Sequence, residues 1–140
     1  MADNVISKTF QFELVSPEKL LASEEAGMVI VPGEEGEFGA LPGHAPFLSS
    51  LRPGVVRVHT PTGEVKRIFV AGGFADVGPA ICSILAEEAV NVAELDRTDV
   101  DQRLKSLNDE LAAEKDDAVR AATLQKQIVV EQAKLAALAA

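Results

Sequence analysis

Hydrophobic and polar residues alternate near the start of the chain with the period of a half-buried β-strand. Phe10, Phe12 and Leu14 alternate with Gln11 and Glu13. A period of two is expected where only one face of a strand is buried. The pattern therefore predicts that the three apolar side chains point into a core.

Further short strands are predicted where apolar runs end at turn residues. Residues 54–70 indicate a hairpin with a Pro-Thr-Gly turn. Other strands are predicted at 28–31, stopped by Pro32-Gly33, and at 74–77 and 81–86. Because the strands are short and no helical segment lies among them, we expect an antiparallel β-sandwich or a flattened barrel.

Apolar residues in the last third of the chain recur at helical spacing. Val100, Leu104, Leu107 and Leu111 lie four, three and four residues apart, which places them on one helix face. We predict Thr98 as the N-cap of this helix.

A second helix is predicted over 118–138, after a polar turn at 114–117. Its apolar side is expected to hold Leu124, Ile128, Leu135 and Leu138. Two helices cannot bury both of their faces by themselves. The hairpin should therefore fold against the β domain or bind an outside partner.

Composition divides the chain into two architectures. All ten glycines, seven prolines and six phenylalanines lie before residue 80. Glycine and proline mark turns, whereas the Ala, Leu, Glu, Lys and Gln that dominate the remainder favour helix. We predict an α+β chain, with an N-terminal antiparallel β-sandwich over 1–94 and a C-terminal antiparallel helical hairpin over 95–140.

The charge balance excludes several classes of partner. A net charge of −9 and a pI near 4.7 argue against nucleic-acid binding and a polybasic membrane patch, which both need clustered Lys and Arg. No apolar run approaches the roughly 20 residues that span a bilayer. We therefore expect no direct membrane insertion, and any membrane association to go through other proteins.

The single cysteine, Cys82, lies in the apolar segment ICSIL. A lone thiol cannot form an internal disulfide, and an apolar strand does not activate it. We expect a core residue and a reducing, cytosol-like compartment. Residues 1–8 lack the features of a signal or transit peptide.

The segment from Val31 to Gly54, VPGEEGEFGALPGHAPFLSSLRPG, is the chief candidate for a functional loop. It contains neither G-x-G-x-x-G nor a terminal G-K-[ST], and no helical pattern follows it. A phosphate site is therefore disfavoured. The glycines more simply permit tight turns with positive φ.

His44 lies near Glu34, Glu35 and Glu37 in the same segment, which raises a metal or acid–base site as an alternative. The spacing is not that of a metal site, and the only other histidine is His59. No Ser or Cys nucleophile is paired with His44. On the simpler interpretation, the glutamates are solvated and His44 fixes the loop through hydrogen bonds to backbone groups.

Charged and apolar side chains stand next to each other at Glu37-Phe38 and Ala40-Leu41-Pro42. Loops of this kind on rigid sheets commonly bind partners. We therefore favour a protein-binding surface over a catalytic or metal site, and we expect neither a cofactor nor a metal.

The residues VPGEEGEFGALPGHAPFLSSLRPGVVRV, followed by VAGGFADV and SILAEEA, closely resemble the epsilon subunit of the rotary proton-translocating ATP synthase, called delta in mitochondria. The core G-E-x-G-x-x-P-G-H-A-P with a later G-G-F is specific to that family. The resemblance runs from FELVSPEKLL to the helical tail. It implies a ten-stranded N-terminal β-sandwich, a C-terminal helical hairpin and no catalytic activity.

The resemblance also implies partners. It places the protein in the rotating central stalk, bound to the gamma subunit and resting on the ring of membrane-embedded c subunits. By similarity, Glu37 meets the polar loops of the c ring and His44 lies near the gamma contact. We expect the neighbouring segment 38–42 to face the c ring with Glu37. The implied partner-binding residues are Glu37, Phe38, Gly39, Leu41, Pro42, Gly43 and His44. A location at the periphery of the bacterial plasma membrane, on its cytoplasmic face, is expected.

The hairpin departs from the family at one motif. In many bacterial members it extends to the alpha and beta catalytic subunits and blocks ATP hydrolysis, and some members bind ATP through [IL]-D-x-x-R-A. Here Leu95 and Asp96 match, but Asp99 stands where the arginine should be. We expect no ATP sensing and only weak inhibition, with basic residues of the second helix as the alternative nucleotide contacts.

Two functions of other classes are also considered. One is a small β-sandwich enzyme that uses His44 with Glu37. The other is a free-standing adaptor whose helical tail recruits unrelated partners. A stable complex with a gamma-like coiled coil would favour the stalk subunit over both.

Overall fold

A computed structural model describes residues 8–140, which fall into two compact units. The first unit ends at Asn91 and the second covers Val92–Ala140. The division into domains at 1–94 and 95–140 stays a prediction. The expectation about a targeting segment concerns chiefly residues 1–7, which lie outside the described residues.

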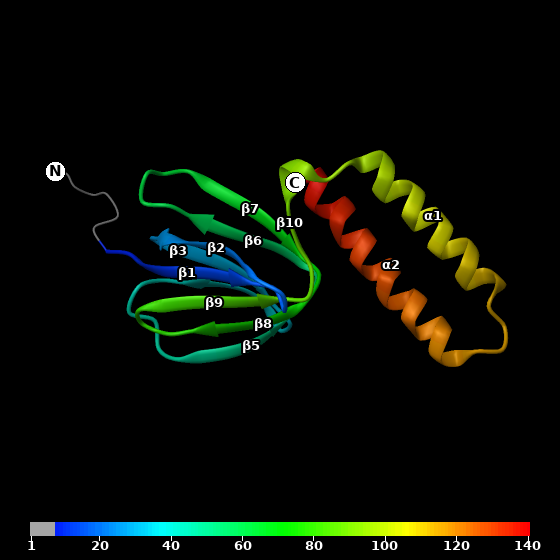
Figure 1. The fold of residues 1–140 in the computed structure, drawn as a ribbon, viewed down its shortest axis with the longest axis horizontal. Helices are drawn as coiled ribbons and strands as arrows, with labels where there is room; N and C mark the ends of the chain where they lie inside the picture. The colour runs from blue at the N-terminus through cyan, green and yellow to red at the C-terminus, as the bar shows by residue number, and fades with distance from the viewer. Residues whose placement is uncertain (1–7) are drawn as a thin grey trace. The chain divides into compact units, whose positions relative to one another are not determined.

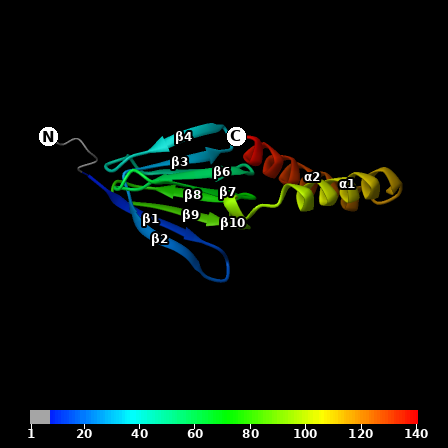
Figure 2. The same cartoon turned by 90° about the horizontal axis from the view of Figure 1, so that it is seen from above.

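Ten strands build a single sheet in the described part of the first unit. Their hydrogen-bonded order is β10-β7-β6-β3-β5-β8-β9-β1-β2, and β4 pairs with β3. The strands, labelled in Figure 1 and Figure 2, are β1 (Phe10–Val15), β2 (Leu20–Ala26), β3 (Met28–Gly33), β4 (Gly36–Ala40), β5 (Phe47–Leu51), β6 (Gly54–His59), β7 (Val65–Val70), β8 (Gly73–Val77), β9 (Ile81–Ala86) and β10 (Ala89–Asn91).

The sheet curls into two layers that share one core. Figure 2 shows β3 and β4 on one side of the unit and β1 and β2 on the other. Phe10, Phe12 and Leu14 of β1 are buried, as the alternation predicts, and belong to the same apolar cluster as Val56 and Val58 of β6. The predicted β-sandwich is confirmed.

The prediction of a wholly antiparallel sheet is wrong at one pair of strands. Strands β1 and β9 run parallel, with a register from Gln11↔Ile81 to Val15↔Leu85. A parallel pair needs a long connection, and here the strands β2 to β8 supply it.

The predicted stop at Pro32-Gly33 is also wrong, because β3 continues through both residues. Pro32 pairs with Glu37, and the carbonyl oxygen of Pro32 accepts from the backbone N of Arg52 at 3.1 Å. The N–H and C=O of a strand residue point to the same side. The position of the missing N–H of Pro32 therefore faces away from β4. The pairing of β3 with β4 does not need this donor.

Two glycines of the sheet are required by close approach of the backbone. At Gly33, an added Cβ would lie 2.7 Å from the carbonyl oxygen of Gly36, which pairs with it across the β3–β4 hairpin. Gly73 has a φ of +131°, and a Cβ there would lie 1.9 Å from the carbonyl oxygen of Leu85. No other residue type fits these sites without backbone movement.

The second unit holds a 3-10 turn, η1 (Val92–Glu94), and two helices, α1 (Arg97–Ala113) and α2 (Ala118–Ala139). The helices and the turn at 114–117 confirm the predicted hairpin. Val100, Leu124 and Ile128 are buried, whereas Leu135 and Leu138 are half-buried.

The N-cap of α1 is Asp96, so the prediction of Thr98 is wrong. Oδ1 of Asp96 accepts from the backbone N of Thr98 at 2.9 Å and of Asp99 at 3.4 Å. The Asp96 carboxylate thus satisfies the first free N–H groups of the helix, and α1 begins at Arg97, before Thr98. Neither α1 nor α2 is both long and apolar enough to cross a membrane.

Candidate partner-binding surface

Glu37 lies on strand β4 rather than in a loop. The predicted functional loop holds two strands, β4 and β5, that the sequence interpretation missed. Oε1 of Glu37 lies 3.0 Å from Nη2 of Arg57, which reaches across β3 from β6. Both side chains are close to half exposed, at 46% and 40%. The carboxylate therefore remains accessible to a partner while held by a cation of its own chain.

Phe38, the next residue, points the other way. It is partly buried and packs against the core, and its ring meets that of Phe47 edge to face with centroids 5.2 Å apart. Alternation along β4 places Glu37 and Gly39 on the outside, where both are exposed. Phe38 thus supports the surface from beneath.

The residues that follow β4 are fixed by backbone hydrogen bonds. The N–H of Gly43 donates to the carbonyl oxygen of Pro79 at 2.8 Å, and that of His44 donates to Leu41 at 3.0 Å. Gly43 has a φ of +85°, which favours glycine. Leu41 is 52% exposed and Pro42 is half-buried. This segment is an ordered connection with an apolar side chain on its surface.

The imidazole of His44 is used locally. Its Nδ1 lies 2.6 Å from the carbonyl oxygen of Ala45, and its ring lies beside Phe47 with centroids 6.5 Å apart. Glu37 bonds Arg57 instead. The structure therefore gives His44 the backbone-fixing role and does not support an enzyme built on His44 and Glu37. Among residues 8–140, no group of three or more His, Cys, Asp and Glu could hold a metal ion.

An exposed row of apolar side chains crosses four strands on the outer face of the sheet. Phe74 of β8 pairs with Leu85 of β9, Leu85 with Val15 of β1, and Val15 with Leu20 of β2. We call these four residues the apolar row. Phe74 is 52%, Leu85 48% and Leu20 56% exposed, and Val15 is half-buried.

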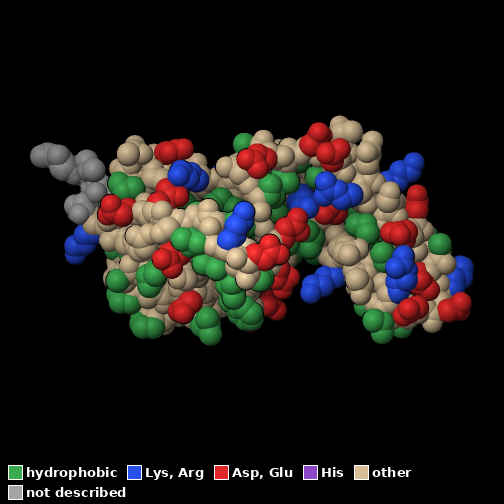
Figure 3. All heavy atoms as spheres, viewed as in Figure 1, with side chains coloured by type: hydrophobic (Ala, Val, Ile, Leu, Met, Phe, Trp, Pro, Cys, Tyr) green, Lys and Arg blue, Asp and Glu red, His purple; other side chains and the backbone are tan. Residues whose placement is uncertain are grey.

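The sequence interpretation identified three of these strands but missed the row. Ala75, Val77, Cys82 and Ile84 fill the inner face of β8 and β9, so Phe74 and Leu85 are apolar residues on the polar side of an alternation. Apolar residues at these solvent-facing positions are the feature of the sequence from which the row could have been predicted. Figure 3 shows hydrophobic side chains at the surface over β5, β8 and β9.

The ionisable groups of the first unit that have shifted pKa values serve the fold. Burial raises the pKa of Cys82 to about 12, and Asp76 adds to the shift, which confirms a core thiol. The hydrogen bond from Lys66 Nζ to Glu24 Oε1, at 2.9 Å, raises the pKa of Lys66. Glu24 lies in β2 and Lys66 in β7, so this pair ties together strands that are not neighbours in the sheet.

The first unit matches the sequence model of a known protein family. The model described as "ATP synthase, Delta/Epsilon chain, beta-sandwich domain" matches residues 9–92. The chain belongs to the ATP synthase delta/epsilon family. The match covers nearly all of the described first unit.

Relatives in this family extend the likeness into the hairpin. The ATP synthase epsilon chain of Rhodospirillum rubrum is 46% identical over 126 residues, which cover 90% of this chain and 94% of that one. The epsilon chain of Mesorhizobium japonicum is 46% identical over 115 residues, which cover 82% and 85%. The epsilon chain is a structural subunit of ATP synthase and not the catalytic one.

Solved structures agree with this assignment. A chain of the Euglena gracilis mitochondrial ATP synthase, from a structure of OSCP, F1 and c-ring, matches with a TM-score of 0.79 and 27% identity over 99% of this chain and 86% of that one. A chain from the central stalk and c-ring of the Tetrahymena thermophila enzyme has a TM-score of 0.63 at 15% identity, over 94% and 97%. The second match shows the fold alone.

Proposed function

We propose that this epsilon chain couples the gamma subunit to the c ring in the central stalk of a proton-translocating ATP synthase. The observation that carries the proposal is the apolar row, Leu20, Val15, Leu85 and Phe74. Contiguous apolar surface is uncommon on a protein that acts alone, and it marks a contact site when polar residues surround it. The family assignment supplies the complex in which that contact is made.

The apolar row suits gamma better than the c ring. A central-stalk subunit must stay bound to gamma throughout rotation, so its interface with gamma is permanent. Permanent interfaces are more apolar than transient ones. Leu48 of β5 is 69% exposed. It pairs with Asp76, two residues along β8 from Phe74. Leu48 and Phe74 therefore lie on the same outer face, with the exposed Asp76 beside Leu48. The N–H of His44 donates to the carbonyl oxygen of Leu41, so residues 41–44 form one turn. We therefore assign His44, Gly43, Pro42, Leu41 and the apolar row to gamma, in place of the c ring that Leu41 and Pro42 were expected to face.

The acidic end of the β3–β4 hairpin suits the c ring. Glu34, Glu35 and Glu37 are all exposed, and only the carboxylate of Glu37 has an ion-pair partner among the described residues. Polar loops with basic side chains would find complementary charge there. Glu37 and the outward Gly39 are the contacts we assign to the c ring, with Phe38 as their support.

Binding to gamma tests the first assignment. We expect Phe74→Ser combined with Leu85→Ser to weaken gamma binding at least tenfold, because both side chains lose apolar contact area. Their exposure means that the melting curve should hardly change. Val119→Ser, at a side chain 78% exposed on α2, is the matched control and should bind like wild type. Equal affinity of all three chains would place gamma elsewhere.

The wider function needs a separate experiment. Affinity capture of the tagged chain from detergent-solubilised bacterial membranes should recover gamma, the c ring and the alpha and beta subunits. Through these partners the subunit would lie at the periphery of the plasma membrane, on its cytoplasmic face. Recovery of unrelated proteins without ATP synthase subunits would favour the adaptor function instead.

A further inference from the structure

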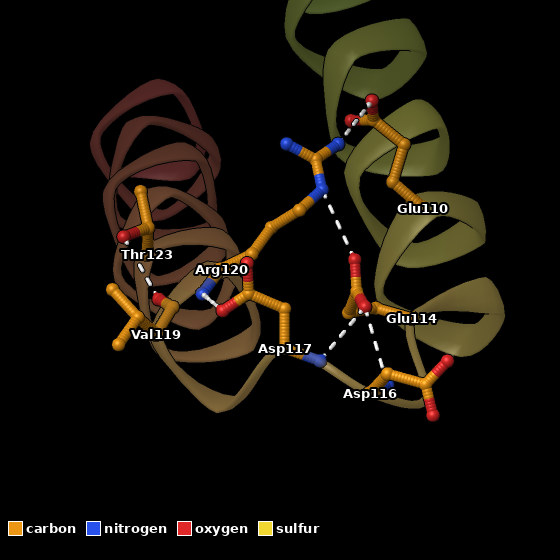
Figure 4. Close-up of polar contacts among 7 residues, drawn as sticks. All are labelled: Glu110, Glu114, Asp116, Asp117, Val119, Arg120 and Thr123. Atoms are coloured by element: carbon orange, nitrogen blue, oxygen red, sulfur yellow. Dashed lines mark hydrogen bonds and ion pairs between the residues drawn. The ribbon is translucent and has the colours of Figure 1, made fainter.

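The turn between α1 and α2 is closed by a network centred on Glu114. Nε of Arg120, near the start of α2, lies 3.2 Å from Glu114 Oε1, and its Nη2 lies 3.3 Å from Glu110 Oε1 of α1 (Figure 4). The other carboxylate oxygen of Glu114 accepts from the backbone N of Asp116 at 3.3 Å and of Asp117 at 3.1 Å. One carboxylate thus connects the end of α1, the turn and the beginning of α2.

The ends of both helices are part of the same network. The backbone N of Glu114 donates to the carbonyl oxygen of Leu111 at 3.2 Å and closes α1. Asp117 Oδ1 accepts from the backbone N of Arg120 at 3.0 Å and caps α2. Arg120 therefore contacts the turn through both its backbone N–H and its guanidinium. A substitution at Glu114 or Arg120 should weaken the contacts at the end of α1 and at the start of α2.

Solvent exposure distinguishes this network from an ordinary surface ion pair. The Glu114 side chain is only 19% exposed, although Arg120 and Glu110 are about half exposed at 51% and 50%. Hydrogen bonds to an ionised group that is partly withdrawn from water are stronger than those of exposed pairs. Exposed pairs contribute little because water and salt screen them.

Apolar packing between the helices leaves room for such a contribution. Leu104, Leu107 and Leu111 on the facing side of α1 are only half-buried. Pairs of short helices are marginal when they bury little apolar surface. One more ion pair joins the helices farther along, between Arg103 of α1 and Glu131 of α2 at 3.5 Å.

We propose that Glu114 and Arg120 form an electrostatic latch that keeps α1 and α2 folded back on each other. Glu110 adds to the latch, and the capped turn fixes its geometry. The inference rests on the hairpin alone and does not depend on the proposed function. A hairpin with this latch opens only after the Glu114 carboxylate has lost its partners.

Amide hydrogen exchange measured by NMR on the full chain tests the latch. Glu114→Gln and Arg120→Gln should each make the amides of Asp116, Asp117 and the first turn of α2 exchange about tenfold faster, which corresponds to ~1.4 kcal/mol. The effect of the double variant on the free energy of opening should be smaller than the sum of the two single effects, because both changes break the Glu114–Arg120 contact. Amides of the β-strands should not change. Additive effects in the double variant would overturn the proposal.

Matched controls carry the same charge changes without the contacts. Asp109→Asn and Lys126→Gln alter exposed side chains of α1 and α2, and neither side chain has a hydrogen-bond or ion-pair partner among residues 8–140. These controls should exchange like wild type. Latch variants that match the controls would show that the turn holds without Glu114 and Arg120.

A second measurement separates opening of the hairpin from fraying of the turn. Spin labels attached to cysteines introduced at the exposed positions Ala112 and Lys126 report the distance between the helices. Circular dichroism should show that helix content is kept. We expect Glu114→Gln with Arg120→Gln to broaden the distance distribution. An unchanged distribution would confine the effect to the turn and overturn the latch.

Discussion

Oε1 of Glu37 lies 3.0 Å from Nη2 of Arg57, across strand β3. The pair joins the edge strand β4 to β6 and holds the only β4 carboxylate at the surface. Because both side chains are close to half exposed, the pair contributes at most about 1 kcal/mol to stability. The pair matters more for binding: a basic partner must either displace Arg57 from the Glu37 carboxylate or bind the carboxylate together with Arg57.

Reversing the charge of Glu37 should impair coupling and leave the fold intact. Glu37→Lys places a cation next to Arg57 and presents the wrong charge to the c ring. We expect less proton pumping per ATP hydrolysed in the reconstituted complex, with the free energy of unfolding lowered by no more than about 1 kcal/mol. Asp109→Lys, the same reversal on α1, is the control.

Arg57→Gln distinguishes a partner contact from a structural role of this ion pair. It removes the pair but leaves the Glu37 carboxylate to meet the c ring, so coupling should be kept. Equal loss of coupling in Glu37→Lys and Arg57→Gln would mean that the pair matters through β4 itself.

The β-sandwich should fold without the hairpin. Truncation after Glu94 keeps all ten strands and the whole apolar cluster of the first unit. We expect a soluble domain that melts cooperatively and still binds gamma, as followed by circular dichroism and co-purification. An unfolded fragment would show that the hairpin is needed for the sandwich to form.

The buried thiol of Cys82 should make stability fall at alkaline pH. An exposed thiol loses its proton near pH 9.0, whereas the folded protein holds it until about 12. Between these pH values the folded state binds more protons than the unfolded state. Its free energy of unfolding should therefore drop by up to ~1.4 kcal/mol per pH unit above about pH 9.

Urea unfolding of wild type and Cys82→Ala between pH 8 and pH 10 measures this term. The variant lacks the thiol but keeps every other titrating group, so subtraction isolates Cys82. We expect the stability advantage of wild type to shrink as the pH rises. A constant difference would mean that the thiol titrates alike in the folded and unfolded states.

Local patterns in the sequence predict the elements whose signals are local. Alternation identifies β1, and the Pro-Thr-Gly turn identifies the β6–β7 hairpin. Strand β4 was missed because Gly36 and Gly39 suggest a turn, although they allow pairing with β3. Strand β2 was missed because its middle, Ser23, Glu24 and Glu25, is polar and largely solvent-facing.

The candidate surface is less predictable because it depends on sheet closure. Phe74, Leu85 and Val15 become neighbours only through the β8–β9 and the parallel β9–β1 registers. The parallel β9–β1 register leaves no local mark in the sequence, because residues 16–80 separate the two strands. By contrast, Glu37 and His44 were found from their motif, and the structure adds that Phe38 between them faces the core.

ATP binding by the isolated subunit should be absent. Asp99 stands at the position of the motif arginine, and Asp96 uses Oδ1 to cap α1. Arg97 lies 3.9 Å from Asp101, and its side chain is rotated by about 200° from position 99. Calorimetry with ATP should give no heat of binding at micromolar concentrations. Micromolar affinity would show that basic residues of α2 replace the missing arginine.

The hairpin should inhibit ATP hydrolysis only weakly. From Thr98 onward it holds six basic residues, Arg103, Lys105, Lys115, Arg120, Lys126 and Lys134, against eight acidic ones. Several of the cations are already paired within the hairpin, as Arg103 is with Glu131 and Arg120 with Glu110 and Glu114. Little positive charge is left to attract an acidic surface of the catalytic subunits.

Complexes assembled with the chain truncated after Glu94 should therefore hydrolyse ATP at nearly the rate of complexes with the full chain. A several-fold rise on truncation would show strong inhibition, and the same comparison with Glu114→Gln would then reveal whether inhibition requires the hairpin to open.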